Sequence, residues 1–269
     1  MEKKILNLNI GCGDIFISNA SWINLDYESK DENVIKCDIL NKLPFKENSI
    51  SNIYSSHFIE HIPLYKIDCF FKSCFKILEH KGVIRLVTPD FFEMTSSYIE
   101  ANNQNNYELA EFIKIEILDQ LVRTREGGGL RIAFNRFVKN DNNKMIEVVN
   151  QRLGHDLRQE KKIDYLINKK NYFKKFKIKF FDIYIKSILK LLPKAFSNQN
   201  VSLAKVGENH KWLWDFNDIK KKLNSAGFIN ISKKKFNESN INNFPFELDQ
   251  KENFPRKGIQ SMYIEAEKY

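Results

Sequence analysis

One sequence feature constrains the possible fold of this chain most. It is a β-rich apolar run that breaks at a pair of glycines and resumes within a dozen residues. Residues 6–27 read LNLNIGCGDIFISNASWINLDY, with Gly11 and Gly13 at the break and Asp26 near the end of the second run. Glycines after a strand let the backbone approach a ligand closely, because no Cβ intervenes. The stretch therefore predicts two strands joined by a ligand-binding turn.

The acids that follow this turn favour one class of ligand over another. A nicotinamide dinucleotide fold would show G-x-G-x-x-G, but Phe16 occupies the position of the third glycine. Asp26 ends the second run, where its carboxylate can accept hydrogen bonds from both hydroxyls of a ribose. Asp38 follows the third run, where it could meet an adenine amino group.

Short β-like runs continue to alternate with turn and helix signals over the first ninety residues. Leu64–His80 has apolar residues at helical spacing, and Gly82 lies just beyond its end. This alternation predicts a mostly parallel α/β sheet. The predicted strands are Ile5–Asn9, Trp22–Asp26, Val34–Cys37, Ile50–Ser55 and Val83–Thr88.

After residue 91 the pattern changes to long, polar-rich, helix-like stretches, and the sheet pattern resumes near residue 206. There we expect a helix over Phe216–Ala226, a strand over Phe228–Lys233 and a last strand over Ile259–Ala266. The chain is thus expected to form one α/β domain from residues 1–92 and 206–269, with a helical Arg- and Lys-rich cap over 93–205.

Composition excludes several classes of protein. Of the 269 residues, 42% are hydrophobic and 29% charged, which is typical of a soluble globular chain. The four cysteines form no Cys-x-x-Cys pair and no cluster with zinc spacing, so we expect no metal. The N-terminus lacks a signal-peptide pattern, and no apolar run reaches the length of about 18 residues that spans a membrane. We expect a reduced, cytoplasmic protein.

The net charge of +9 is concentrated in one segment. Residues 161–194 contain eleven Lys and two Asp, so they account for the whole excess. Within 172–193, charged residues recur every three or four positions and predict a broad apolar helix with one polar stripe. Such a helix could pack on the domain or on a second subunit, which we favour, or lie on an anionic membrane surface. A nucleic-acid partner is not expected, because binding faces for nucleic acid are usually basic throughout.

Several motifs in order resemble those of class I S-adenosylmethionine-dependent methyltransferases, of the broad group called methyltransferase type 11. The resemblance covers about half of the chain and implies a Rossmann-like sheet, mostly parallel with an antiparallel last strand. It rests on LNIGCG (8–13), INLDY (23–27), KCDILNKLPFKENSI (36–50), IYSSHFIEHI (53–62), GVIRLVTPDF (82–91) and GENHKWLWDFNDIKKKLNSAGFINI (207–231).

The resemblance implies S-adenosylmethionine as cofactor and assigns residues to it. Gly11, Cys12 and Gly13 would pass beneath its methionine part, Asp26 would bind the ribose, and Asp38 and Ile39 the adenine. Ser56 and His57 would border the sulfonium, and Tyr27 is a further cofactor-binding candidate. One feature departs from the family. Only eight residues separate Gly13 from Trp22, which is too few for a full crossover helix, so we expect the first helix to be missing or reduced to a turn.

Methyl transfer from a sulfonium is an in-line displacement, which alignment of the reactants can accelerate greatly. A general base helps when the acceptor is a hydroxyl. The candidate catalytic residues are His210, which we favour, Asp90 and His61. Each has a structural alternative: His210 could pack among aromatic rings, Asp90 could cap the next helix, and His61 could hydrogen-bond a backbone carbonyl.

Arginine is unevenly distributed, with six of the eight residues in the predicted cap. The planar guanidinium suits phosphate or carboxylate, and Gly127–Gly129 would permit a mobile loop between them. We therefore expect Arg123, Arg125, Arg131 and Arg136 to bind an anionic substrate, although a solvent-exposed helix surface would look the same.

The sequence thus predicts an S-adenosylmethionine-dependent methyltransferase acting on a small anionic metabolite. The expected reaction is O-methylation of a saccharide or of a nucleotide-linked or phosphorylated precursor, as in surface polysaccharide biosynthesis. Two alternatives stay open: an RNA methyltransferase, and a non-catalytic, membrane-associated binding protein.

Overall fold

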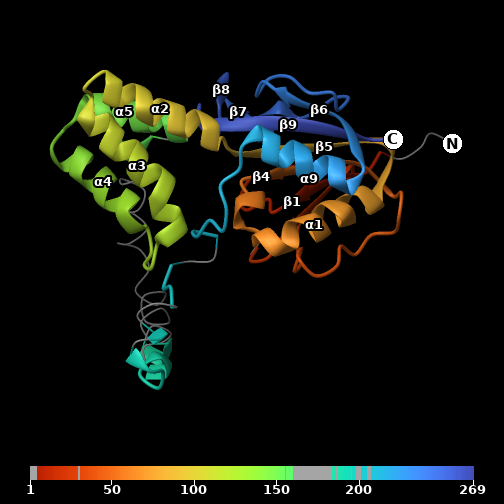
Figure 1. The fold of residues 1–269 in the computed structure, drawn as a ribbon. Coiled ribbons are helices and arrows are strands. Elements are labelled where there is room, and N and C mark those ends of the chain that lie inside the picture. The colour runs from red at the N-terminus through yellow and green to blue at the C-terminus, as the bar shows by residue number, and fades with distance from the viewer. Residues whose placement is uncertain are drawn as a thin grey trace.

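The computed structural model describes residues 5–29, 31–154, 156–159, 183–185, 187–194, 196–197, 201–204 and 207–269 (Figure 1). The helix predicted over residues 172–193 lies largely outside this part of the chain, as does most of the Lys-rich segment. None of the described helices is both long and apolar enough to cross a membrane.

A seven-stranded sheet forms the centre of the fold, in the order β3-β2-β1-β4-β5-β9-β6. Its first five strands in sequence are mutually parallel, and β9 runs antiparallel to both of its neighbours. The predicted fold class, a mostly parallel Rossmann-like sheet with an antiparallel last strand, is confirmed. The strands are β1 (Asn7–Ile10), β2 (Trp22–Asp26), β3 (Val34–Lys36), β4 (Ile50–Ser56), β5 (Leu78–Pro89), β6 (Phe228–Lys234) and β9 (Ser261–Lys268).

Two helices, α1 (Leu64–Ile77) and α9 (Phe216–Ala226), pack against the sheet and against each other. Helix α9 has the predicted bounds, but α1 ends three residues earlier than the periodicity suggests. Leu78 already has extended backbone angles and pairs with Ile50 of β4, so strand pairing overrides the helical pattern here.

No helix joins β1 to β2, as the short spacing predicted. Ile15 and Ile17 of this coil instead pack in a small apolar cluster with Trp22, Tyr54 and Tyr263. The long connection between β6 and β9 completes that cluster. It contains the 3-10 helix η2 (Phe246–Leu248) and the short strands β7 (Gln250–Lys251) and β8 (Phe254–Pro255).

A buried ion-pair network fastens this connection to the sheet. The fully buried Arg85 of β5 donates to Asp249 at 2.7 Å and to Glu265 at 2.8 Å, and Tyr54 Oη donates to Asp249 at 2.6 Å. Breaking a buried pair of this kind is costly, because it leaves a charge without a partner. The network thereby fixes Leu248, next to Asp249, where it borders the cleft described below.

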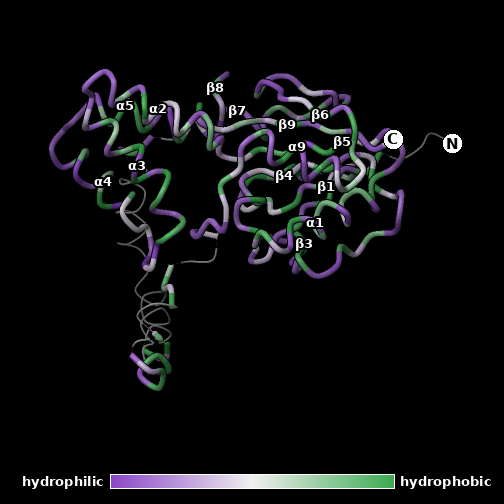
Figure 2. The backbone as a smooth tube through the Cα atoms, viewed as in Figure 1, coloured by the Kyte–Doolittle hydropathy of each residue, from purple (hydrophilic) through white to green (hydrophobic). Residues whose placement is uncertain are grey.

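Between β5 and α9, four helices share an apolar core of their own, around Phe112, Phe137 and Val149. Figures 1 and 2 show this bundle beside the sheet, with hydrophobic residues in both parts. The helices are α2 (Phe91–Asn103), α3 (Tyr107–Val122), α4 (Gly128–Lys139) and α5 (Asn143–Leu153).

The Gly127–Gly129 stretch is not the loop that the sequence suggested, because α4 begins at Gly128. Gly127 caps the helix with φ +74°, a left-handed conformation that glycine adopts readily. The backbone N–H groups of Gly129 and Leu130 donate to the Asp119 carboxylate of α3. The first N–H groups of a helix have no partner within the helix. By accepting two of them, the Asp119 carboxylate holds the start of α4 in place.

Candidate functional site

A cleft of about 770 Å³ opens at the carboxyl ends of β1, β2 and β4, the edge where open α/β sheets bind ligands. Its volume is typical of small-molecule sites. The lining residues include Gly11, Cys12, Gly13, Asp14, Asp26, Tyr27 and Glu28 at one end, and Ser56, His57, His61, Asn209, Lys211, Leu248 and Lys257 at the other. We call Gly11, Cys12, Gly13 and Asp26 the glycine end, and His57, Glu60, His61 and His210 the histidine end.

The glycine end is shaped by backbone conformation. Gly11 has φ +65°, and a Cβ at this position would lie 2.4 Å from Phe58 Cδ2. Only glycine fits there without displacing the ring. Gly13 also has a positive φ, +53°, but a Cβ would meet open space, and its N–H donates to Asp26 Oδ2 at 2.9 Å. The turn and the acid at the end of β2 thus form one unit.

Two predicted cofactor residues lie apart from this unit. Asp38 accepts hydrogen bonds from the Leu40 backbone N–H and the Asn41 side chain, and Ile39 is buried in the main core. Neither lines the cleft, whereas the other seven do. Burial, aided by the charge of Asp26, raises the pKa of the Cys12 thiol to about 12, so this cysteine is a neutral thiol rather than a nucleophile.

The histidine end is built on the 3-10 helix η1 (Ile59–His61), directly after β4. His57 has φ +50°, an uncommon backbone conformation for a residue with a side chain. Its Nε2 lies 3.0 Å from Ser261 Oγ, and its Nδ1 lies 3.2 Å from Glu60 Oε1. Glu60 is completely buried, and its Oε2 accepts a hydrogen bond from Thr88 Oγ1 at 3.1 Å.

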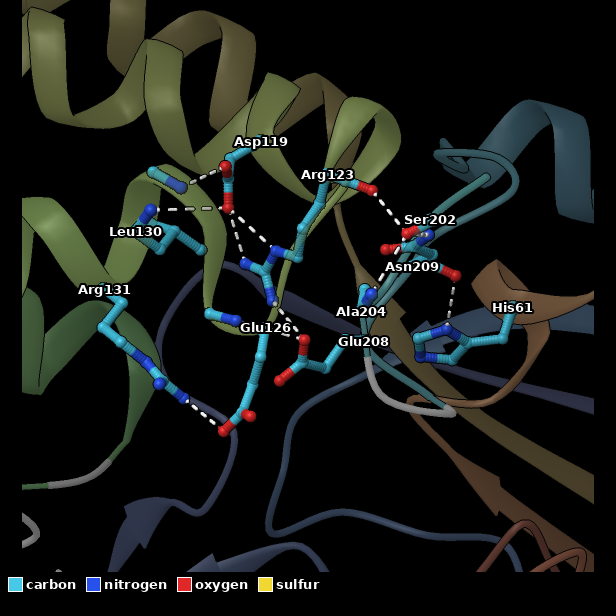
Figure 3. Close-up of polar contacts among 12 residues, drawn as sticks. His61, Asp119, Arg123, Glu126, Leu130, Arg131, Ser202, Ala204, Glu208 and Asn209 are labelled. Carbon is cyan, nitrogen blue, oxygen red and sulfur yellow. Dashed lines mark hydrogen bonds and ion pairs between the residues drawn. The ribbon is translucent and has the colours of Figure 1, made fainter. Parts of the chain in front are cut away.

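His210 reaches this cluster from the segment that returns the chain to the sheet. Its ring lies 4.9 Å from the ring of His61, centroid to centroid. Its backbone N–H donates to the Gln120 carbonyl of α3, and the next N–H, of Lys211, donates to the Glu60 carbonyl at 2.7 Å. The segment therefore ties the helical bundle to η1, and Figure 3 shows His61 beside it.

Burial sets the charge states in the cluster. It lowers the pKa of His210 to about 4, with the charge of Glu60 opposing it only in part, and it also lowers the pKa of His57. Burial alone would raise the pKa of Glu60, but the neighbouring histidines, His57 first, outweigh it and hold the pKa at about 2. At neutral pH the cluster thus contains the buried carboxylate of Glu60 beside the neutral imidazoles of His57 and His210.

The three predicted catalytic residues occupy different surroundings. His61 lines the cleft, whereas His210 lies behind it and is 6% exposed. Asp90 does not line the cleft: its carboxylate accepts from the backbone N–H groups of Phe92 and Glu93, at the start of α2, and from Lys233 Nζ at 2.7 Å. The structure thus shows Asp90 in the capping position that the sequence offered as an alternative.

None of the four predicted substrate-binding arginines lines the cleft. Arg123 is 8% exposed and pairs with Asp119 at 2.6 Å and with Glu208 at 3.7 Å (Figure 3). Two exposed ones also pair with carboxylates, Arg131 with Glu126 and Arg136 with Glu111. Arg125 forms no ion pair among the described residues, and its backbone bridges to Leu203.

The cleft instead contains two cations that the sequence did not single out, Lys211 and Lys257. Burial lowers the pKa of Lys257, while the charge of Glu60 acts to raise it. Within the described part of the chain, neither ammonium group forms an ion pair. Lys211 adjoins the predicted base His210 and could have been suspected for that reason, but no pattern in the sequence marks Lys257.

No family model and no curated protein matches the chain. Solved structures that it resembles include a methyltransferase dependent on S-adenosylmethionine from Archaeoglobus fulgidus, with 13% identity, a TM-score of 0.41, and 98% of this chain and 86% of that chain covered. Another, from Mesorhizobium loti, has 17% identity, a TM-score of 0.27, and 32% and 47% covered. A phosphoethanolamine N-methyltransferase from Haemonchus contortus, in complex with phosphoethanolamine and S-adenosylhomocysteine, has 12% identity, a TM-score of 0.28, and 33% and 24% covered. The chain thus spans less than half of the last two proteins.

Proposed function

We propose that this protein transfers a methyl group from S-adenosylmethionine to an oxygen atom of a small anionic molecule. The observation that carries the proposal is the polarity of one cleft. Its glycine end is acidic, with Asp14, Asp26 and Glu28, and its other end holds two lysines and two histidines. The ribose of the cofactor suits the first end, and an anionic acceptor suits the second.

In the proposed arrangement, the cofactor lies over the Gly11–Gly13 turn, and its ribose hydroxyls donate to Asp26. Ser56 and His57 then border the sulfonium, as the resemblance implies, and Asp38 and Ile39 keep their proposed place near the adenine. Lys211 and Lys257 hold the acceptor by its negative charge, and we place the loss of its hydroxyl proton at the histidine end. Fixed alignment of acceptor and methyl group supplies much of the rate enhancement.

We favour a saccharide, or a nucleotide-linked or phosphorylated precursor of one, as the acceptor. Such molecules carry both the hydroxyl and the negative charge that the cleft would recognise. We also propose that Arg125, in the helical cap, contacts the anionic group of the acceptor. Of the four predicted substrate-binding arginines, it is the one that forms no ion pair among the described residues.

Calorimetry with S-adenosylmethionine tests the cofactor half of the proposal. We expect micromolar binding that Asp26→Ala weakens at least tenfold, because hydrogen bonds to a charged group contribute about 1.5–3 kcal/mol each. Asp68→Ala, which removes an exposed carboxylate on α1, is the matched control. Absence of binding to the wild-type protein would refute the proposal.

A panel of nucleotide-linked sugars and phosphorylated metabolites tests the acceptor half, with release of S-adenosylhomocysteine as readout. Turnover should require both the hydroxyl and the anionic group of the acceptor. Equal turnover of a neutral analogue would contradict the anionic assignment while leaving methyl transfer intact.

A further inference from the structure

Glu60, His61 and His210 place three metal-ligating groups together, with His61 lining the cleft and the other two buried beside it. Each offers one ligand atom, and these atoms all lie within 4.8 Å of one another. Glu60 and His61 are adjacent in η1, and His210 comes from the segment before α9. The sequence contained no zinc spacing because the third residue arrives through the tertiary fold.

The buried carboxylate of Glu60 is balanced by the histidines around it and, beyond ion-pair distance, by Lys257. No Lys or Arg of the described residues forms an ion pair with Glu60. Its Oε1 lies 3.2 Å from His57 Nδ1 but makes no well-aligned hydrogen bond. Burial of an ionised carboxylate is costly unless a counter-charge or a metal compensates. The site therefore favours occupation by a cation.

His61 is oriented as a metal ligand would be. Its Nδ1 lies 3.0 Å from the carbonyl oxygen of Asn209 (Figure 3). A carbonyl only accepts hydrogen bonds, so Nδ1 carries the proton and Nε2 carries the free lone pair. Metal-binding histidines usually donate their second N–H to a backbone carbonyl or a carboxylate in this way.

We infer that Glu60, His61 and His210 bind one divalent transition-metal ion of the zinc class. Two imidazole nitrogens and one carboxylate oxygen are a ligand set that such ions take, with a fourth position open. Metal–ligand bonds of about 2.0–2.2 Å require ligand atoms about 3.4 Å apart in a tetrahedron. The longest of these separations must therefore shorten by up to about 1.4 Å around the ion, and the half-buried His61 is the least enclosed of the three ligands.

The catalytic consequence rests on the proposed function. Because His61 lines the cleft, a bound ion would act there as a Lewis acid that lowers the pKa of an acceptor hydroxyl and favours loss of its proton to water at neutral pH. The acceptor oxygen then forms a bond to the methyl carbon. The carbon–sulfur bond breaks, and its electron pair stays on sulfur as the thioether of S-adenosylhomocysteine.

Cobalt(II) is the probe for the site, since its visible absorption reports coordination number directly. After treatment with a chelator, the full-length protein should bind one equivalent of Co²⁺ with a four- or five-coordinate spectrum, and Zn²⁺ should displace it. His61→Ala and His210→Ala should each weaken binding at least tenfold. His80→Ala is the matched control and should bind normally, because the His80 ring packs edge-on against Tyr269 and is not one of the three ligands.

The wild-type titration decides the inference even if a variant fails to fold. No Co²⁺ or Zn²⁺ bound at micromolar concentration, or binding that survives both substitutions in folded protein, would overturn it. Turnover that persists in chelator, with no metal bound, would overturn the metal site and leave methyl transfer standing. A bound metal without turnover of any acceptor would count against the proposed function and not against the site.

Discussion

The glycine end of the cleft comes from one short piece of chain, whereas the histidine end is assembled from distant segments. Gly11, Gly13 and Asp26 lie within two strands and the turn between them, and Gly13 N–H donates directly to Asp26. At the other end, His61 meets the Asn209 carbonyl, which is 148 residues away in sequence. A local unit can be recognised from spacing alone, but an assembled one depends on the whole fold.

The same difference appears in the charges. The Asp26 carboxylate accepts hydrogen bonds from the backbone N–H groups of Gly13 and Glu28, and Asp26 lines the cleft. Glu60, by contrast, is completely buried among side chains whose charge states depend on one another. The first end can bind a ligand with little rearrangement. At the second end, binding of a proton or a metal ion changes the net charge of the buried cluster.

The largest effect should follow removal of the histidine that reaches the cleft. His61→Ala should lower turnover by about 10²–10⁴-fold, the range typical of a lost acid–base group, while S-adenosylmethionine still binds. Rapid-quench or steady-state kinetics, beside calorimetry, would measure both. If turnover is unchanged and cofactor binding fails, the two ends do not divide their roles as proposed.

In the metal-free protein, His210 should reduce stability as the pH falls. Its pKa in the folded protein is about 4, against an ordinary value of 6.5. The unfolded chain therefore binds a proton first, and the free energy of unfolding falls between pH 6.5 and 4 by up to about 3 kcal/mol. The lowered pKa of His57 adds to this loss, whereas the stabilising effect of Glu60 is lost only below its ordinary value of 4.5.

Urea unfolding across this pH range checks the effect. The other charged or titratable groups that act on His210 are Glu60, His61, His57 and Arg123. His210→Gln should flatten the profile, and His80→Gln should leave it unchanged. A profile that is steep in both variants would place the titration elsewhere in the molecule.

The two glycines offer a smaller and cleaner comparison. Gly13→Ala should cost about 1–2 kcal/mol of unfolding free energy, because only the left-handed backbone is strained and the space beside it is open. Gly11→Ala should cost more, since the new methyl group would also displace Phe58. Thermal unfolding of the two variants measures the difference. Equal losses would show that Phe58 moves aside freely.

Much of the sheet could be predicted because its signals are local. The Trp22–Asp26 strand and the Phe216–Ala226 helix have the predicted bounds, and the missing first helix followed from a count of eight residues. The end of α1 could not be predicted, since pairing of Leu78 with β4 decides it.

At the site, sequence could locate the glycine turn but not the partners of the arginines. Arg123 looked like a free anion-binding group, yet Asp119, one helical turn earlier, and the distant Glu208 neutralise it. Lys257 lies in an irregular connection before β9, where no periodicity or motif points inward. Such residues enter a site through the path of a loop, which sequence spacing does not encode.

The smallest predicted effect separates the two proposed anion sites. Lys257→Gln should raise KM for an anionic acceptor about tenfold, equivalent to about 1.4 kcal/mol of lost attraction, with kcat nearly unchanged because charge recognition acts in the ground and transition states alike. Lys139→Gln, an exposed position at the end of α4, is the control. Arg125→Gln tests the cap in the same assay. A tenfold rise in KM for Arg125→Gln and none for Lys257→Gln would mean that the cap binds the anionic group of the acceptor, as the sequence predicted. A rise in KM for both variants would mean that the acceptor contacts the cleft and the bundle together.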